Sequence, residues 1–475
     1  MRRTWVALGL FGLMFPSPAA TADDALRDAA GQALRRAVGF FREHVAREGG
    51  YVFRYSEDLA RREGEERVGS TTAWLQPPGT PAVGMAYLTA LEATYDPYYL
   101  DAARETAMAL VRGQLRSGGW DHRIEFDPKE RARYSYRVDP ERRGARNVTT
   151  LDDNKTQSAV RLLMGVDRAL GFKDPIIHEA TRYALDHLTA AQYPNGAWPQ
   201  RFHAPPDPDK FPVKRAGYPE SWPRDHPKSD YGSYYTFNDN TQADMVGVML
   251  EAARVYEEPR FRASARRGGD FVLLAQMPDP QPAWAQQYGS EMHPAWARKF
   301  EPPAITGGES HGALRILLHV YRETGDARYL EPIPRALDYL RRSRLPDGRL
   351  ARFYELKTNR PLYFTRDYRL TYESSDMPTH YAFIVGDQTD SIARDYDRLR
   401  DGGPDRPETP PRRPGRPQEG RVREVIAALD ERGRWVEEGR LRTHGDDDPA
   451  RRIIDSRTFV RNVETLARYL DAARP

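Results

Sequence analysis

The stretch Gly118-Gly119-Trp120-Asp121-His122-Arg123 joins a tight turn, an aromatic side chain and a basic residue, and it recurs as Asn195-Gly196-Ala197-Trp198-Pro199-Gln200-Arg201. Related turns occur at 49–54, 282–286 and 347–353 of the 475-residue chain. Repeated turns at intervals of this size are the signature of a repeat architecture.

Pairs of amphipathic helices are predicted between these turns. Met85, Leu88 and Leu91 place apolar side chains on one helical face, and the same spacing returns in three later segments. Asp96-Pro97 and Asp174-Pro175 are typical helix starts, because the aspartate caps free amides and proline suits the first helical position. Four helix pairs joined by aromatic turns predict an all-α fold, an (α/α) toroid or incomplete barrel with a groove at its loop end.

The ends of the chain differ from the repeats. Arg2 and Arg3 precede a short apolar run and an Ala-x-Ala arrangement, which predicts a secretory signal peptide at 1–22. We expect 23–475 to form a single catalytic domain. The proline-rich segment 401–420 is expected to be an exposed insert, and 421–475 to supply helices that cap or close the ring.

Charge and cysteine content limit the function. Without the predicted signal, 70 Lys and Arg face 69 Asp and Glu, so global charge predicts no nucleic-acid partner. No later segment is long enough to span a membrane. The absence of cysteine in an exported chain fits a secreted or periplasmic bacterial protein, which we expect to be a monomer.

Acidic residues precede two of the predicted helices. Asp152, Asp153 and Asp239 stand just before them, so helix capping would explain one acid at each site. Capping does not explain the second acid of the Asp152-Asp153 pair. Carboxylate and amide oxygens that converge from neighbouring helix starts would instead suit a hard cation such as Ca²⁺.

Aromatic and basic residues gather in the same loops. Trp198 could pack in its turn or stack on a sugar ring, and both roles remain open. Arg352, Arg360 and Arg366 lie among aromatic residues, which favours partly buried guanidinium groups over solvated ones. Guanidinium groups are well matched to carboxylates.

Five ordered motifs carry a resemblance to a known family: 150–156, 192–200, 236–239, 300–303 and 352–367. Together they resemble the pectate lyases of polysaccharide lyase family ten over roughly Tyr51 to Arg369. The resemblance implies a secreted enzyme with an incomplete α/α toroid that cleaves polygalacturonate by β-elimination with the help of Ca²⁺.

The resemblance also implies roles for particular residues. Asp152 matches the acid of the substrate site, and Asp239, with Asp153 beside it, matches the calcium site. Arg352 and Arg366 resemble the arginines that bind uronate carboxylates, with Trp198, Asn154 and Tyr354 as further substrate contacts. The base of the family is an arginine, for which Arg298 is the candidate. A free guanidinium is protonated in almost every setting, so the residues alone predict a charge-neutralising role.

Two positions depart from the family pattern. Asp153 stands where asparagine is usual, and Lys155 stands where alanine is usual; segments 202–233 and 369–383 also diverge. Lys155 could replace a cation or fill the groove, so altered substrate preference or loss of activity is an open alternative. A toroidal glycoside hydrolase using Asp152 and Asp239, and a noncatalytic binder of acidic glycans, are the other functions considered.

Overall fold

The computed structural model describes residues 22–228, 230–404 and 417–472. The predicted signal peptide, apart from Ala22, and most of the proline-rich insert lie outside the described residues. The described chain is mostly helical, as predicted. None of its helices is both long and apolar enough to cross a membrane.

The main helices form pairs along the chain. Their bounds are α1 Ala22–Phe40, α2 Thr80–Thr94, α3 Pro97–Gly113, α5 Lys155–Ala169, α6 Pro175–Ala190, α7 Thr241–Tyr256, α8 Pro259–Ala275, α9 Gly307–Thr324, α10 Ile333–Arg342, α11 Thr389–Gly402, α12 Glu419–Ala427 and α13 Ser456–Ala472, with a short α4 at Pro128–Arg131 and a π-helical turn, η1, at Phe41–Val45. Asp96 and Asp174 cap α3 and α6 through their side chains, and proline follows each of them, as the sequence predicts.

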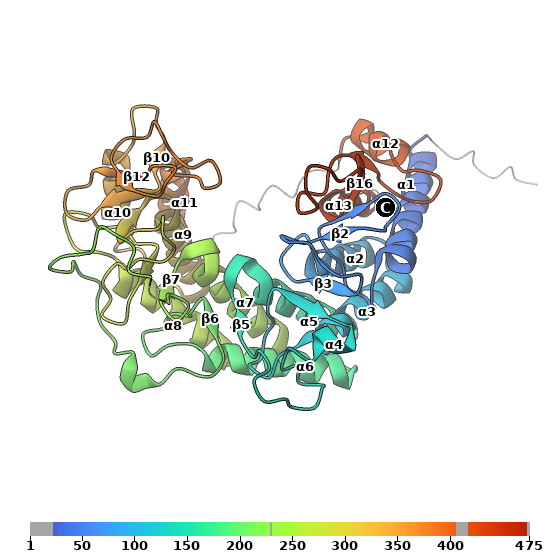
Figure 1. Cartoon of the computed structure of the whole chain (residues 1–475), viewed down its shortest axis with the longest axis horizontal. Helices are drawn as coiled ribbons and strands as arrows, with labels where there is room; N and C mark the ends of the chain where they lie inside the picture. Colours follow the sequence, from blue (N-terminus) through green and yellow to red (C-terminus); the bar gives the residue numbers. More distant parts are fainter. Residues whose placement is uncertain (1–21, 229, 405–416, 473–475) are drawn as a thin grey trace, which may run out of the picture.

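The pairs build an open arc. Helices α13, α2, α5, α7 and α9 pack in succession, each with a partner helix beside it. Figure 1 shows the two arms of the arc, with α9, α10 and α11 on one side and α1, α12 and α13 on the other. The fold is therefore an incomplete α/α toroid and not a closed barrel.

The first and last described helices meet in one unit of this arc. Helix α13 packs against α1 and α2, and β16 (Arg452–Asp455) pairs with β1 (Arg54–Ser56). We expected 421–475 to cap or close the ring; closure does not occur, because α12 and α13 pack against α1. These helices complete the first unit and leave the arc open.

One hydrogen-bonding pattern holds neighbouring units together. The backbone N–H and C=O of Tyr51 both bond to the hydroxyl of Thr80, in the first turn of the next helix pair. The same double contact joins the turn aromatics Trp120, Trp198 and Trp284 to Thr156, Gln242 and Ser310. A single polar side chain thus satisfies two buried backbone groups in each unit, as burial requires.

The turn tryptophans anchor their own units. The indole N–H groups of Trp120 and Trp198 donate to carbonyls ten residues earlier, in Leu110 and Leu188. Trp435 makes the same contact with Val425, which identifies the C-terminal segment as a further copy of the repeat.

Short strands lie at the loop end of the units. Their bounds are β1 Arg54–Ser56, β2 Arg62–Glu63, β3 Thr72–Trp74, β4 Arg123–Glu125, β5 Thr149–Thr150, β6 Arg201–Phe202, β7 Tyr235–Thr236, β8 Gln287–Tyr288, β9 Ala304–Thr306, β10 Leu350–Ala351, β11 Phe353–Glu355, β12 Pro361–Phe364, β13 Leu370–Thr371, β14 Ile384–Val385, β15 Glu437–Glu438 and β16 Arg452–Asp455. They form small antiparallel sheets, in which a strand after a turn aromatic pairs with the strand that leads into the first helix of the same unit, as β6 does with β5. This pairing positions the acidic loops described next.

Candidate active site

Two helix starts with the same backbone geometry face each other. The 3₁₀ turn η2 (Asp152–Asn154) leads into α5, and η4 (Asn238–Asn240) leads into α7; the two turns are in contact. Asp153 and Asn154 have φ of 50° and 58°, and Asp239 and Asn240 have φ of 48° and 59°. Consecutive left-handed residues are uncommon outside glycine, and strained backbone of this kind is concentrated at functional sites.

Helix capping does not explain these acids. The residues at the N-cap positions of α5 and α7 are Asn154 and Asn240, and neither helix has a side-chain cap hydrogen bond. Asp96 and Asp174, by contrast, accept hydrogen bonds from the first-turn amides of their helices. The carboxylates at η2 and η4 are therefore free for another role.

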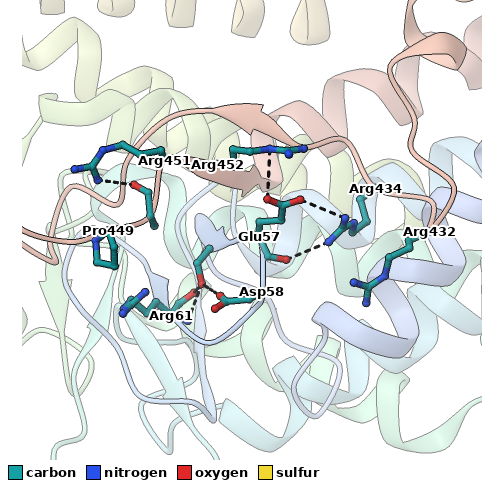
Figure 2. Close-up of a pocket in the computed structure, with 10 residues that line it drawn as sticks. Glu57, Asp58, Arg61, Arg432, Arg434, Pro449, Arg451 and Arg452 are labelled. Carbon is teal, nitrogen blue, oxygen red and sulfur yellow. Dashed lines mark hydrogen bonds and ion pairs between the residues drawn. The ribbon is translucent and has the colours of Figure 1, made fainter.

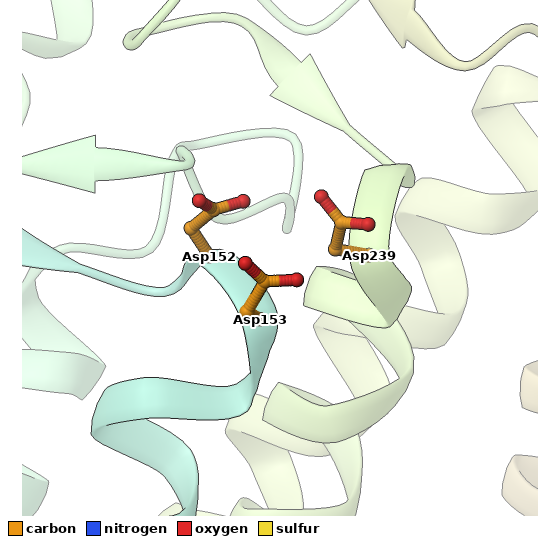
Figure 3. A group of neighbouring side chains, drawn as sticks. All are labelled: Asp152, Asp153 and Asp239. Atoms are coloured by element: carbon orange, nitrogen blue, oxygen red, sulfur yellow. The ribbon is translucent and has the colours of Figure 1, made fainter. Parts of the chain in front are cut away.

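Asp152, Asp153 and Asp239 form one acidic cluster. One carboxylate oxygen of each lies within 4.8 Å of the others, and Figure 3 shows the three carboxylates grouped between η2 and η4. Gln200 donates to Asp152 at 2.8 Å, and Asn238 donates to Asp239. The structure thus brings together the three acids that the sequence singled out.

Lys155 supplies a positive charge to this cluster. Its ammonium nitrogen lies 3.0 Å from Asp153 Oδ2 and 3.6 Å from Asp152 Oδ2, and its side chain is fully buried. Lys155 therefore does not obstruct the groove. It is a buried counter-ion to the Asp152-Asp153 pair.

Asp152 and Asp239, which lie on the two facing turns, have pKa values displaced in opposite directions. Burial acts to raise the pKa of Asp152, but the charge of Lys155 and hydrogen bonds from Asp239 and Gln200 lower it below its ordinary value. Burial, together with the charges of Asp153 and Asp152, raises the pKa of Asp239 to about 8. Asp239 is thus the acid that Lys155 leaves uncompensated.

The donor set of the cluster fits a hard cation. Three carboxylates are the ligands that Ca²⁺ prefers. The amide oxygens of Gln200 and Asn238, which flank the acids, are buried and have no hydrogen-bond partner among the described residues. A pocket of about 390 Å³ adjoins the cluster and is lined by Gln76, Pro77, Asp153, Asn154, Asp239, Asn240 and Asp244.

Two arginines share an aromatic support near this cluster. Arg298 and Arg352 both lie over the ring of Tyr381, with guanidinium carbons 5.4 and 4.5 Å from its centroid. Glu301, which is buried, binds Arg298 through two hydrogen bonds of 2.9 and 2.6 Å and accepts a third from Tyr381. Glu309 binds Arg352 at 2.8 Å. We call Arg298 and Arg352 the arginine pair.

The arginine pair is held in its charged form. Burial alone would lower the pKa of Arg298, but Glu301, Tyr381 and Asp239 raise it above its ordinary value. Burial likewise opposes the charge of Arg352, and Glu309, Tyr381, Glu301 and Asp239 raise its pKa. Because Asp239 influences both arginines, the acidic cluster and the arginine pair belong to one electrostatic site.

Partnerless polar atoms mark this site as well. Within the described residues, Arg352 Nε, Glu309 Oε2 and Gln286 Nε2 are buried without a hydrogen-bond partner. Each such group costs about 1–3 kcal/mol unless something pairs with it. Buried polar atoms without a partner, gathered beside the arginine pair, are typical of a site that binds a polar ligand.

Three of the other predicted site residues lie away from the acidic cluster, and one lies beside it. Trp198 and Tyr354 are buried, and their polar atoms bind backbone groups of Leu188 and Ser343, which removes both from the substrate contacts. Arg366 does not lie among buried rings as expected: its side chain is 73% exposed and pairs with Asp376. Asn154 lines the pocket, where its side-chain oxygen accepts from Arg161.

Two residues at the site had little signal in the sequence. Tyr381 belongs to the segment 369–383, which diverges from the family pattern. Its ring lies under both guanidinium groups only because of the path that this segment takes in the fold. His122 follows the turn residue Trp120, and its electrostatic partners include Lys155 and Asp152. Burial and then Lys155 lower the pKa of His122, so its imidazole is mainly neutral at pH 7.

The chain has weak structural similarity to several known proteins and matches one family model in sequence. No curated protein matches the chain. The family 10 polysaccharide lyase from Cellvibrio cellulosa superposes with a TM-score of 0.46 at 21% identity, covering 68% of this chain and 97% of the lyase. The GH76 α-mannanase from Bacteroides thetaiotaomicron gives 0.41 at 10% identity, with 95% and 96% covered. The cellobiose 2-epimerase from Spirochaeta thermophila gives 0.41 at 15%, with 70% and 75% covered.

A family model gives the more specific result. The pectic acid lyase model matches residues 114–319, a range that includes the acidic cluster and Arg298. The resemblance to pectic acid lyases that the sequence motifs indicated is therefore confirmed over residues 114–319.

Proposed function

We propose that this protein is a secreted polysaccharide lyase that cleaves polygalacturonate by β-elimination with the assistance of Ca²⁺. The observation that carries the proposal is the juxtaposition of three carboxylates with two charged arginines in one site. The match to the pectic acid lyase model over residues 114–319 supports the same reaction class.

The reaction needs positive charge at the uronate carboxylate. Removal of the proton on the neighbouring ring carbon places negative charge on that carboxylate. The bond to the glycosidic oxygen then breaks, a carbon–carbon double bond forms, and the leaving oxygen takes a proton. Cations fixed in advance around the carboxylate stabilise this charge without reorganisation.

The arginine pair is suited to that task. Glu301 and Glu309 hold the two guanidinium groups, and both remain protonated at neutral pH. Asp152, Asp153 and Asp239 would hold Ca²⁺, which supplies further positive charge when bound.

Arg298 remains the catalytic candidate. In this structure Glu301 keeps its guanidinium charged, so Arg298 can act as a base only if substrate binding separates it from Glu301. His122 is mainly neutral and interacts electrostatically with Lys155 and Asp152. It is therefore the alternative candidate for the base that removes the proton.

A glycoside hydrolase is the second candidate. Asp152 and Asp239 lie close together with pKa values displaced in opposite directions, a pattern shared with the carboxylate pairs of glycosidases. A hydrolase of this type gives no role to the arginine pair, so we place it second.

Product mass distinguishes the two reactions. Purified protein should be incubated with polygalacturonate and Ca²⁺, and the oligosaccharides analysed by mass spectrometry. Elimination yields a new non-reducing end that is lighter by one water than the end left by hydrolysis. Unsaturated products support the proposal, whereas fully hydrated products would establish the hydrolase instead. Arg298→Lys and His122→Ala then test proton removal, since loss of the base should reduce turnover far more than substrate affinity.

A further inference from the structure

A second charged pocket lies where the two ends of the chain meet. It has a volume of about 560 Å³ and lies beside the paired strands β1 and β16. Figure 2 shows its lining, which comprises Arg61, Arg432, Arg434, Arg451, Arg452, Ser56, Glu57, Asp58, Pro449 and Ala450. We call it the arginine pocket.

A rigid arginine forms part of its wall. Arg434 is nearly buried, and it donates to Asp430 at 2.7 Å and to the backbone oxygen of Glu57 at 3.2 Å. Glu57 lies between Arg434 and Arg452, with contacts of 3.4 and 3.3 Å, and so offsets part of their charge. The side chains of Arg434 and Glu57 are therefore held in place before a ligand binds.

Two other arginines keep their charge available. Arg451 donates to the backbone carbonyls of Asp448 and Ala450, which are neutral acceptors. The guanidinium of Arg432 lies 6.0 Å from the ring of Phe40. Among the described residues, neither guanidinium is paired with a carboxylate. Both side chains are exposed, so their free N–H donors can reach a ligand.

The chemistry of the lining defines the ligand. Of its five arginines, Arg61, Arg434 and Arg452 pair with carboxylates, whereas Arg432 and Arg451 supply the positive charge that is left for a ligand. Guanidinium forks bind carboxylates and phosphates through paired hydrogen bonds. The volume falls within the range of about 300–1,000 Å³ that is usual for small-molecule sites.

We propose that the arginine pocket is a second anion-binding site, which holds the carboxylates of an acidic oligosaccharide through Arg432 and Arg451. The choice of a uronate over inorganic phosphate rests on the proposed function. The pocket takes no part in elimination, because none of its lining residues belongs to the acidic cluster or to the arginine pair. It holds the saccharide away from the reacting bond.

Calorimetry with trigalacturonate in the presence of a chelator tests this site without turnover. We expect Arg432→Ala/Arg451→Ala to weaken binding at one site by about 10-fold or more, as loss of a charged hydrogen-bonding pair does. Arg168→Ala/Arg342→Ala, which removes the same charge from distant exposed positions on α5 and α10, should change it less than about 2-fold. Thermal unfolding of each variant verifies that it is folded.

Further experiments distinguish failure of the pocket proposal from failure of the proposed lyase function. Arg352→Ala weakens the proposed active site, so it should retain the binding event that the pocket variant loses. Binding of trigalacturonate that is equal in wild type and the pocket variant would overturn the proposal. Arginine-dependent binding of phosphate without binding of trigalacturonate would overturn the choice of a uronate. If the pocket binds trigalacturonate but no unsaturated product forms with Ca²⁺, the pocket stands and the proposed lyase function fails.

Discussion

The two turns that face each other across the site share a backbone but differ in charge. In both η2 and η4, an Asp-Asn pair adopts left-handed φ values directly before a helix. The next residue is Lys155 in one case and Thr241 in the other, and both are fully buried. Lys155 compensates the acids of η2, whereas Thr241 only donates to the backbone of Asn238. The two turns therefore share a geometry that presents carboxylate oxygens, and one residue difference decides which half of the cluster has a positive charge beside it.

The acid without a counter-ion should have the largest effect on activity. We expect Asp239→Asn to reduce turnover of polygalacturonate by about 100-fold or more, because it removes a charge from the proposed cation site. The control is Asp338→Asn on the exposed face of α10, which should leave turnover unchanged. Turnover of Asp239→Asn near that of wild type would show that η4 does not serve catalysis.

Loss of Lys155, the buried counter-ion to the acids of η2, should have the largest effect on the free energy of unfolding. Lys155→Met leaves two acids uncompensated and should lower the free energy of unfolding by about 3 kcal/mol without added metal. Thr241→Val, the matched change at η4, should cost only about 1 kcal/mol. Urea unfolding measures both. Added Ca²⁺ should raise the stability of Lys155→Met more than that of wild type, and equal effects at the two turns would contradict the proposed difference.

The raised pKa of Asp239 predicts a pH dependence of stability. Its carboxyl titrates near 3.8 when unfolded and about 8 when folded, so between these values the folded state binds more protons. The contribution of Asp239 to stability is therefore full below about pH 4 and is lost as pH rises to 8. In metal-free urea unfolding, Asp239→Asn should be more stable than wild type at pH 8 by at least about 1 kcal/mol. That difference should shrink at pH 5, and a difference independent of pH would refute the shift.

Substitutions at the left-handed backbone positions that η2 and η4 share should have the smallest effects on stability. Asn240→Ala places an alanine in a left-handed conformation and should cost about 1 kcal/mol, whereas Asn240→Gly should be nearly neutral. Asn154→Ala should cost more than Asn240→Ala, because Asn154 also accepts a hydrogen bond from Arg161. Thermal unfolding distinguishes these variants, and equal losses for glycine and alanine would mean that the backbone conformation is not the cause.

Local signals in the sequence were sufficient to predict the repeat. Asp-Pro helix starts, helical spacing and the tryptophan turns each depend on neighbouring residues, and the structure confirms them in α3, α6 and the Trp120 and Trp198 turns. The pairing of α13 with α1 could not be predicted in this way, because it joins segments from opposite ends of the chain.

The site was predictable only in part, for the same reason. The motifs singled out the three acids and Arg352, and the resemblance to the lyase family singled out Arg298, but the sequence paired Arg352 with Arg366 and not with Arg298. Burial of Trp198 and Tyr354 could not be read from their spacing, because a packing aromatic and a sugar-binding aromatic look alike in sequence. The position of Tyr381 beneath the arginine pair depends on a long loop whose path the sequence does not indicate.

Ultraviolet absorbance during incubation with polygalacturonate tests the central claim most directly. Only elimination produces an unsaturated uronate that absorbs there, so the proposed lyase predicts a steady rise with Ca²⁺ that a chelator suppresses. The same assay with Asp239→Asn should show almost no rise. No rise from the wild-type protein on polygalacturonate or on other uronate polymers, with Ca²⁺ present, would contradict the proposed function.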